Sequence, residues 1–367
     1  MRIAQVAPLY ESVPPRLYGG TERVVSYLTE ELVAAGHDVT LFASGDSQTS
    51  ARLVPIVPHA LREAGVRDAL APHVLMLETV YRRIESFDIV HFHCDYLHFA
   101  TSRRTRFAHL TTLHGRLDLP ETVQLLRAFP DMPLVSISDS QRGPIPEASW
   151  ESTIHHGLPA NLYQLRETPG DYLAFVGRIS PEKRLDLAIE IARRVGMPLR
   201  VAAKVDRADT AYYHEVIKPL LHPGVEMIGE IGDREKQDFL GNARALVFPI
   251  DWPEPFGLVM VEAMACGTPV IAFRRGSVPE VIDEGVTGLI VDSVDEAIAA
   301  LPRVMALDRQ GVRRQFERRF TATRMAKDYL DVYRSLLSRS QIEAEPAESL
   351  QPSADLGDPA GSRVLVA

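Results

Sequence analysis

The sequence has little cysteine, no long apolar run and no excess of basic residues. Cys94 and Cys266 are its two cysteines among 367 residues, a usage that favours reduced thiols and a cytoplasmic protein over a disulfide-linked one. No run of about 18 apolar residues is present, so no membrane-spanning helix is expected. Asp and Glu number 49 against 40 Lys and Arg, a net charge of -9, which argues against nucleic acid as a partner.

Several common catalytic signatures are also missing. None of the five lysines follows a glycine, so there is no P-loop, and no Gly-x-Ser-x-Gly segment marks a serine hydrolase. The early glycine turn reads Tyr18-Gly19-Gly20-Thr21-Glu22, which lacks the Gly-x-Gly-x-x-Gly spacing of dinucleotide sites. No Asp-x-Asp pair is present to hold a metal. No cofactor is therefore expected.

Short β-rich runs alternate with amphipathic stretches along most of the chain. This alternation predicts βαβ units and parallel sheets, an α/β fold of two Rossmann-like domains that face each other across a cleft. Strands are expected at 3–7, 38–43, 88–93, 109–114, 134–138 and 153–156, and then at 172–176, 199–203, 245–249, 269–273 and 288–291.

The domain boundaries follow from the breaks in this alternation. Residues 1–160 form the expected first domain and residues 168–325 the second, because the stretch 157–170, where the two meet, is polar, has no periodicity and contains Pro159 and Pro169. A helix over 326–340 is expected to cross back to the first domain. Residues 341–367 are rich in Glu, Ala, Pro, Ser and Gly and predict a disordered acidic tail.

A histidine-rich segment raises one metal hypothesis. His91, His93, Asp95 and His98 have a spacing that a divalent cation can use, as in a metal-dependent hydrolase. His91 and His93 lie on one face of an expected strand, near its carboxyl end, where polar residues commonly end a buried strand. Metallo-β-lactamase-like enzymes place a histidine directly after the aspartate, whereas Tyr96 follows here. The structural interpretation of these residues is favoured.

The segment 251–267 is the most informative part of the chain. Glu254 follows an expected strand, at the edge of the sheet where α/β proteins bind ligands. The helix expected over 258–266 is apolar on all sides except at Glu262, which predicts a buried helix. A buried carboxylate needs a partner, either an arginine from a neighbouring helix or the hydroxyl groups of a ligand. The start of this helix offers free N–H groups to an anion.

A second segment combines two basic residues with a helix start. Arg178 ends an expected strand, and Ser180 is expected to cap a helix that has Pro181 in its first turn. Lys183 in that turn would oppose the helix dipole, which is easier to understand if an anion binds there. The alternative is a pair of solvated bases.

Together these residues resemble the retaining family 4 glycosyltransferases of GT-B fold. The resemblance covers about residues 1–339 and includes Glu254 and Glu262 with Pro-Phe-Gly after the first glutamate, Gly177-Arg178 with Lys183, and Gly19-Gly20. It implies a hexosyltransferase that moves a sugar, with retention and without a metal, from a nucleotide-sugar donor, expected to be UDP-linked. The acceptor is a hydroxyl group on a small molecule, a lipid-linked sugar or a polysaccharide precursor.

The resemblance also implies a role for each matching residue. Arg178 and Lys183 hold the donor diphosphate, Glu262 bonds the ribose, and Glu254 lies near the donor sugar. His114 touches the sugar near the reacting centre. Backbone groups complete the donor site. Those of Phe256, Gly257 and Leu258 meet the sugar hydroxyls, and those of Gly20 and Val259 lie beside the phosphates.

Two alternatives keep the same fold: a nucleotide-sugar epimerase and a phosphorylase. A peripheral contact with the inner face of a membrane is a further hypothesis, because arginines cluster in two helical regions, where a solvated helix face is the simpler explanation. These arginines are Arg103, Arg104, Arg106, Arg313, Arg314, Arg318 and Arg319.

Overall fold

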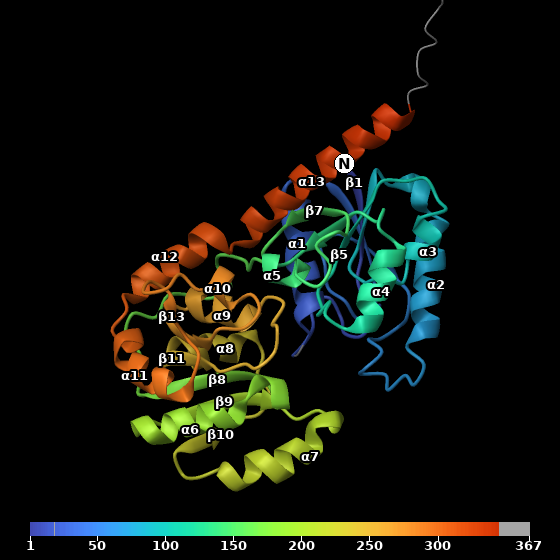
Figure 1. Cartoon of the computed structure of the whole chain (residues 1–367). Helices are drawn as coiled ribbons and strands as arrows, with labels where there is room; N and C mark the ends of the chain where they lie inside the picture. The colour runs from blue at the N-terminus through green and yellow to red at the C-terminus, as the bar shows by residue number, and fades with distance from the viewer. Residues whose placement is uncertain (18, 345–367) are drawn as a thin grey trace, which may run out of the picture.

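The computed structural model describes residues 1–17 and 19–344 and contains two parallel β-sheets with helices packed around them (Figure 1). The first sheet has the strand order β3-β2-β1-β4-β5-β6-β7, and the second has the order β10-β9-β8-β11-β12-β13. Every pairing within both sheets is parallel. The predicted pair of Rossmann-like units is therefore confirmed.

The first unit alternates strands and helices from the N-terminus. Its strands are β1 (Arg2–Val6), β2 (Asp38–Ala43), β3 (Arg52–Pro55), β4 (Ile89–Phe92), β5 (His109–Thr112), β6 (Leu134–Ser136) and β7 (Trp150–Thr153). Its helices are α1 (Gly20–Ala34), α2 (Leu70–Tyr81), α3 (Phe99–Ser102), α4 (Pro120–Ala128) and α5 (Asp139–Arg142).

The second unit repeats the pattern and is followed by three C-terminal helices. Its strands are β8 (Tyr172–Arg178), β9 (Leu199–Lys204), β10 (Val225–Met227), β11 (Ala243–Phe248), β12 (Val270–Phe273) and β13 (Gly288–Val291). Its helices are α6 (Leu185–Val195), α7 (Thr210–Tyr212), α8 (Asp233–Gly241), α9 (Leu258–Ala265) and α10 (Val278–Val281), then α11 (Val294–Met305), α12 (Arg309–Arg319) and α13 (Ala322–Ala344).

The expected strands are present, with one clear displacement. The strand expected at 153–156 is β7, which ends at Thr153, because the buried residues that follow it belong to the segment leading out of the first unit. Two strands, β3 and β10, were not expected. Both are short edge strands, of four and three residues, whose side chains are mostly half-buried or exposed, and β3 ends at Pro55.

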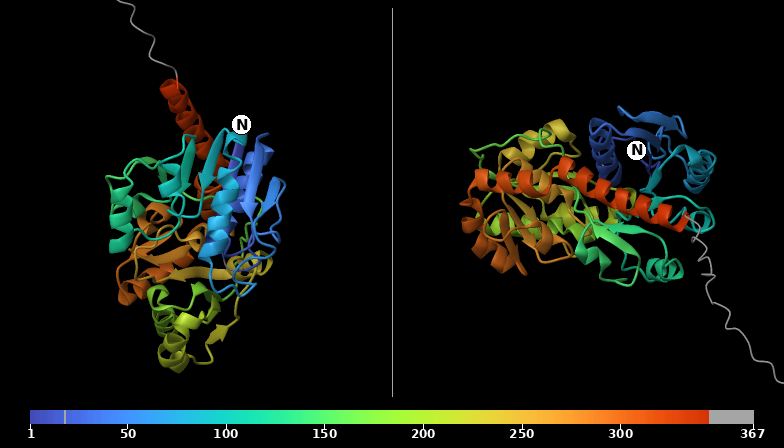
Figure 2. Two further views of the ribbon diagram at one scale, coloured as in Figure 1. Left: turned by 90° about the vertical axis from the view of Figure 1, so that its right-hand side faces the viewer. Right: turned by 90° about the horizontal axis from the view of Figure 1, so that it is seen from above.

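The chain passes between the two units at two adjacent places. On the outward passage, the Leu158 N–H donates to the Phe320 carbonyl (2.9 Å), and on the return the Ala322 N–H donates to the Leu158 carbonyl (2.7 Å). Helix α13 then runs back along the first unit and packs against α1 (Figure 2). It ends at Ala344, four residues into the segment expected to be disordered, and residues 345–367 of that segment lie outside the described residues.

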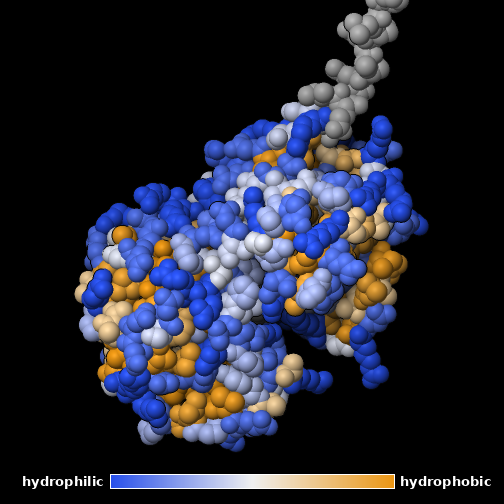
Figure 3. Space-filling model, viewed as in Figure 1, coloured by the Kyte–Doolittle hydropathy of each residue, from blue (hydrophilic) through white to orange (hydrophobic). Residues whose placement is uncertain are grey.

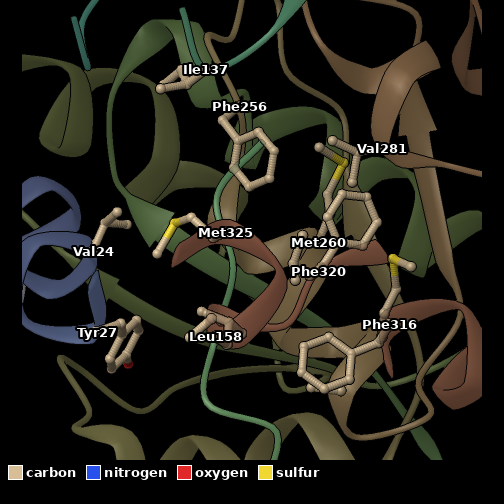
Figure 4. Packing of buried hydrophobic residues seen from close by; sticks show 14 of the residues in the cluster. Val24, Tyr27, Ile137, Leu158, Phe256, Met260, Val281, Phe316, Phe320 and Met325 are labelled. Carbon is tan, nitrogen blue, oxygen red and sulfur yellow. The ribbon is translucent and has the colours of Figure 1, made fainter. Parts of the chain in front are cut away.

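A single buried apolar cluster joins the two units around these passages. Figure 4 shows Leu158 from the connecting segment beside Met325 of α13, with Val24 of α1 on one side and Phe256 and Phe320 on the other. All five side chains are at most 2 % exposed. The core thus continues from one unit into the other and fixes how the two sheets face.

Within the described residues, no helix combines the length and the apolar character that crossing a bilayer requires.

Two arginines of α12 make contacts that tie this helix to neighbouring segments. Arg313 donates to the carbonyls of Ala160, Tyr163 and Ala265, and Arg319 pairs with Asp283.

The crossing of the two passages generates a stability prediction. A Cβ atom at Gly157 would lie 2.2 Å from the Thr321 carbonyl oxygen, so Gly157→Ala must push the passages apart. We expect it to destabilise the protein by about 1–3 kcal/mol, seen as a lower urea midpoint. Gly115→Ala is the matched control, because its Cβ meets nothing within 4 Å. Equal midpoints for the two variants would contradict the prediction.

Candidate functional site

The two sheets enclose a cleft of about 520 Å³ between the ends of their strands. The surface is notched between the two lobes (Figure 3). The cleft is lined by side chains that follow β4, β5, β8 and β11, at the carboxyl edges where α/β sheets bind ligands. All the site residues expected from the sequence line it together: Gly20, His114, Arg178, Lys183, Glu254, Phe256, Gly257, Leu258, Val259 and Glu262.

Glu254 and Lys183 form an ion pair inside the cleft. The Lys183 ammonium donates to the Glu254 carboxylate, and the Trp252 indole N–H donates to the same oxygen at 2.9 Å. The ammonium also lies 4.8 Å from the centre of the Trp252 ring, within the range of a cation–π contact. The three side chains therefore hold one another in place at the wall of the cleft.

The backbone around Glu254 is fixed by the turn that precedes α10. Gly276 has φ 53° and packs so closely that a Cβ there would lie 2.3 Å from the Glu254 backbone. The Ser277 N–H donates to the Glu254 carbonyl at 2.9 Å, and the Ser277 hydroxyl donates to the Phe256 carbonyl at 2.9 Å. The loop that carries Glu254 is thus clamped by a distant segment of the chain.

Glu262 lies on α9 and is 3 % exposed. Its carboxylate accepts from the Lys236 ammonium of α8 at 2.7 Å. The sequence left its partner as either an arginine or a ligand, and the partner within the protein is a lysine from the neighbouring helix. Arg23 of α1 contributes a further positive charge close by and pairs with Asp233 at the start of α8. Glu262 thus lies where the two units meet.

Arg178 ends β8 and is surrounded by acidic side chains. It pairs with Glu182, and its Nε lies 3.3 Å from the Asp209 carboxylate. The Asp251 N–H donates to the Glu182 carbonyl at 2.8 Å, which ties this turn to the Glu254 loop. Arg178 and Lys183 therefore reach the cleft from one compact turn.

Two helix N-termini approach each other across the cleft. Helix α1 begins at Gly20 and α9 at Leu258, and a Cβ at Gly20 would lie 3.6 Å from the Leu258 side chain. Gly257 precedes α9 with φ 77°, a left-handed conformation that favours glycine. The free N–H groups of both helices face the same space, an arrangement that suits an anion.

His114 follows β5 and lies beside two other histidines. Its Nε2 is 2.9 Å from His93 Nδ1, and its ring stacks on that of His156 with 5.2 Å between centroids. Burial lowers the pKa of His114 to about 3, so its imidazole is neutral at physiological pH. It is therefore a hydrogen-bonding group rather than a cation.

Two acidic side chains of the first unit also line the cleft. Glu22, in the first turn of α1, is 5 % exposed, and burial raises its pKa to about 7. Asp95 adopts φ 52°, a strained conformation for a residue with a side chain and one that is common at functional sites. Glu22 was not among the site residues expected from the sequence.

The histidine cluster does not form a metal site. Within residues 1–17 and 19–344, no three His, Cys, Asp or Glu side chains are grouped as metal ligands. His91 bonds Tyr333 and Thr112, whereas His98 bonds Ser102 and Thr111. Their ring nitrogens are occupied within the core, so the hydrolase hypothesis loses its ligand set.

One local expectation was wrong. Residues Pro181–Lys183 form a single 3₁₀ turn, Ser180 caps nothing with its side chain, and α6 begins only at Leu185. Lys183 therefore lies outside the first turn of an α-helix, and its charge is balanced by Glu254 rather than opposed by a helix dipole. The anion argument for Lys183 now rests on its position in the cleft.

Sequence reasoning also missed three contributors to the site, Arg23, Lys236 and His156. Arg23 and Lys236 each lie three residues after the start of a helix. A basic residue at such a position is common on solvent-exposed helices, so it does not stand out in the sequence. His156 stands in the segment His155-His156-Gly157-Leu158, and its place beside His114 depends on contacts between distant segments.

Comparison with known families accounts for both units. Residues 18–141 match the model of Glycosyltransferase Family 4, and residues 164–319 match that of Glycosyl transferases group 1. The D-inositol 3-phosphate glycosyltransferase of Saccharomonospora viridis is 33% identical over 186 residues, 45% of this chain and 43% of the relative. The alpha-maltose-1-phosphate synthase of Mycolicibacterium smegmatis is 28% identical over 45% of this chain and 48% of the relative. The match thus spans less than half the length of these relatives.

Solved structures agree in fold over nearly the whole chain. The glycosyltransferase AviGT4 of avilamycin A biosynthesis has a TM-score of 0.71 at 24% identity, over 92% of this chain and 98% of its own. Anabaena Alr3699/HepE, solved with UDP and glucose, has a TM-score of 0.71 at 17% identity, over 91% of this chain and 100% of its own. With its two units matched by the two family models and its architecture matched by these structures, the chain belongs to the GT4-type glycosyltransferases of GT-B fold.

Proposed function

We propose that the protein transfers a hexose from a nucleotide-sugar donor, UDP-linked, to a hydroxyl acceptor with retention at the anomeric carbon. The observation that carries the proposal is the grouping of Arg178, Lys183, Glu254 and Glu262 with two helix N-termini in one cleft. UDP and glucose bind to a protein of the same fold, Anabaena Alr3699/HepE, which supports this choice of donor.

The donor is proposed to bind mainly to the second unit. Its diphosphate would lie at the start of α9, between Arg178 and Lys183, with the α1 turn at Gly20 opposite. Glu262 would accept hydrogen bonds from the ribose hydroxyls. Glu254 and the backbone at Phe256, Gly257 and Leu258 would bind the sugar, and Val259 would lie beside the phosphates.

Charge stabilisation is the main task of the site in this proposal. As the bond from sugar to phosphate breaks, negative charge grows on the departing diphosphate, where Arg178, Lys183 and the helix N–H groups supply positive charge. These groups provide the stabilisation that a metal ion gives other transferases. Neutral His114 would lie against the sugar near the reacting carbon. Retention is supported by the resemblance to family 4 rather than by a pair of facing carboxylates.

The acceptor would enter from the first unit, where Glu22 and Asp95 line the cleft.

A peripheral membrane contact is supported by the exposed apolar side chains of α2. Leu70, Val74 and Leu75 are 55–62% exposed, and Figure 3 shows apolar side chains on the surface of the right-hand lobe. The arginines offer less support, since Arg103 already pairs with Asp131.

Substituting Glu262 should weaken donor binding. Glu262→Gln keeps the size of the side chain but loses the negative charge that would accept from the ribose hydroxyls. A charge-assisted hydrogen bond contributes about 1.5–3 kcal/mol, so we expect the Kd of UDP-glucose to rise at least tenfold in calorimetry. Glu226→Gln, which removes an exposed carboxylate paired with Arg200, is the control. Equal Kd values would exclude Glu262 from the donor site.

Substituting Lys183 should slow turnover more than it weakens binding. Lys183→Met removes positive charge beside the departing diphosphate, and kcat for release of UDP should fall by about 10²-fold or more. Lys327→Met is the control, because this lysine forms an exposed pair with Asp331 on α13. Following the sugar of UDP-glucose by NMR in the same reactions also distinguishes transfer of the sugar from its epimerisation. A kcat within twofold of the wild type would remove Lys183 from the mechanism.

The raised pKa of Glu22 predicts a pH dependence of donor binding. Glu22 ionises as the pH rises through about 7 and then repels a diphosphate at the start of α1. We expect the Kd of UDP-glucose to increase about fivefold between pH 6 and pH 8. This corresponds to a repulsion of about 1 kcal/mol between the ionised Glu22 carboxylate and the diphosphate at a high effective dielectric constant. Glu22→Gln should bind equally well at both values. A wild-type Kd independent of pH would contradict the prediction.

A further inference from the structure

Two glutamates of the second unit reach the cleft already paired with a base. Glu254 pairs with Lys183, and Glu262 pairs with Lys236. Within the described residues, these bonds go to one oxygen of each carboxylate, and the second oxygen accepts none. Because the charge of each carboxylate is compensated inside the protein, its second oxygen suits an uncharged hydroxyl group of a ligand.

Two carboxylates of the first unit line the same cleft without a base. In residues 1–17 and 19–344, no side chain forms an ion pair with Glu22 or Asp95, and none donates a hydrogen bond to them. Asp95 is exposed. Glu22 is 5 % exposed, and neither of its oxygens is among the fully buried atoms that lack a partner in this part of the chain. The Glu22 carboxylate therefore keeps surface that a ligand can reach.

The arginines of the first unit that line the cleft are engaged by other acids. The Arg62 guanidinium pairs with Glu11 at 2.9 Å. Arg23, which follows Glu22 in α1, pairs with Asp233 of the second unit. Neither arginine is left to compensate the two unpaired carboxylates.

The histidines that line the cleft do not supply positive charge either. Burial lowers the pKa values of His93, His114 and His156 far below the ordinary value, so their rings are neutral at physiological pH. The first unit therefore presents two carboxylates to the cleft whose charge is not balanced by a neighbouring cation.

A ligand that enters this side of the cleft displaces water from both carboxylates. The loss of that water is costly unless the ligand supplies hydrogen bonds and positive charge in its place. A phosphate group would be repelled, and a hydroxyl group would supply a hydrogen bond without the charge. An ammonium group supplies both, as a charge-assisted hydrogen bond.

We propose that the acceptor is a polyhydroxylated amine, an amino sugar or an aminocyclitol, whose ammonium groups lie against Glu22 and Asp95. The inference rests on the proposed function, because it names the class of acceptor for that reaction. The carboxylates of the cleft then have two tasks. Those paired with lysines accept from hydroxyl groups, and the two unpaired ones bind the charge of the acceptor.

An ammonium group beside Glu22 would also favour binding of the donor. Burial raises the pKa of Glu22 to about 7, so at pH 7.5 most of its carboxylate is ionised at the start of α1, where the diphosphate is proposed to bind. A bound amine compensates that charge. Donor and acceptor should therefore strengthen each other's binding.

Ligands that differ mainly in charge test the class of acceptor on the full chain. In calorimetry at pH 7.5 with excess UDP, streptamine, a diaminocyclitol, is compared with neutral myo-inositol and with inositol 1-phosphate. Glucosamine and N-acetylglucosamine repeat the comparison on a sugar ring. We expect each amine to bind at least tenfold more tightly than its neutral counterpart, and the phosphate to bind most weakly. The proposal is overturned if neither amine binds more tightly than its counterpart, or if the phosphate binds most tightly.

Two variants test where the amine binds. Glu22→Gln and Asp95→Asn keep the size of each side chain, and asparagine tolerates the φ of 52° at position 95. Each should raise the Kd of the amine about tenfold and leave that of the neutral counterpart within twofold. Glu78→Gln is the control, because Glu78 forms an exposed pair with Arg82 on the outside of α2. An unchanged Kd of the amine in both variants would overturn the assigned site.

The binding of UDP in the same samples separates this inference from the proposed function. A saturating amine should lower the Kd of UDP about threefold in the wild type and leave it unchanged in Glu22→Gln. A Kd of UDP that does not respond to the amine would overturn its placement beside Glu22. UDP binding without a preference for amines would overturn the acceptor class alone, whereas a chain that does not bind UDP would overturn the proposed function.

Discussion

The cleft depends on two ion pairs, each between a buried glutamate and a lysine. A carboxylate removed from water is costly unless a positive charge and hydrogen bonds compensate it. Glu254 has Lys183 and Trp252, and Glu262 has Lys236. These pairs allow acidic and basic groups to stand side by side in a narrow space. Without them the second unit could not present carboxylate acceptors for hydroxyl groups next to cations for a diphosphate.

The pairs join segments that are far apart in the sequence, so they depend on the sheets for their geometry. Lys183 follows β8 and Glu254 follows β11, two adjacent strands in the parallel sheet. In a parallel sheet the carboxyl ends lie at one edge, which brings their loops together. The Gly276 turn after β12 then clamps the Glu254 loop from the next strand along. Binding geometry is therefore set by the strand order.

The sequence predicted the elements with strong periodicity and the residues with an unusual combination of types. The buried helix around Glu262 is one such case, because a lone carboxylate in an apolar run is rare. The edge strands β3 and β10 could not be predicted, since they are only four and three residues long and bury little. Lys236 and Arg23 gave no local signal either. Their role depends on which helix packs against α9, which is a property of the tertiary structure.

The histidines show that a local sequence pattern can also suggest a site that the tertiary structure does not form. The spacing of His91, His93 and His98 suggested a cation site, yet neighbouring strands and α13 supply a hydrogen-bond partner for every ring. Spacing along one strand shows which side chains share a face. It does not show what packs against that face, and here the partner is a tyrosine more than 240 residues away in the sequence.

The return of α13 to the first unit affects the order in which the protein can fold as it is synthesised. Gln5 of β1 is bonded to Tyr333, 328 residues later in the chain. The first unit therefore cannot complete its core until the second unit and most of α13 have left the ribosome. Until then, polar side chains at the centre of the first sheet lack their partners. An N-terminal fragment that ends before α13 would keep this defect, so the two units do not divide into independent modules at the segment that joins them.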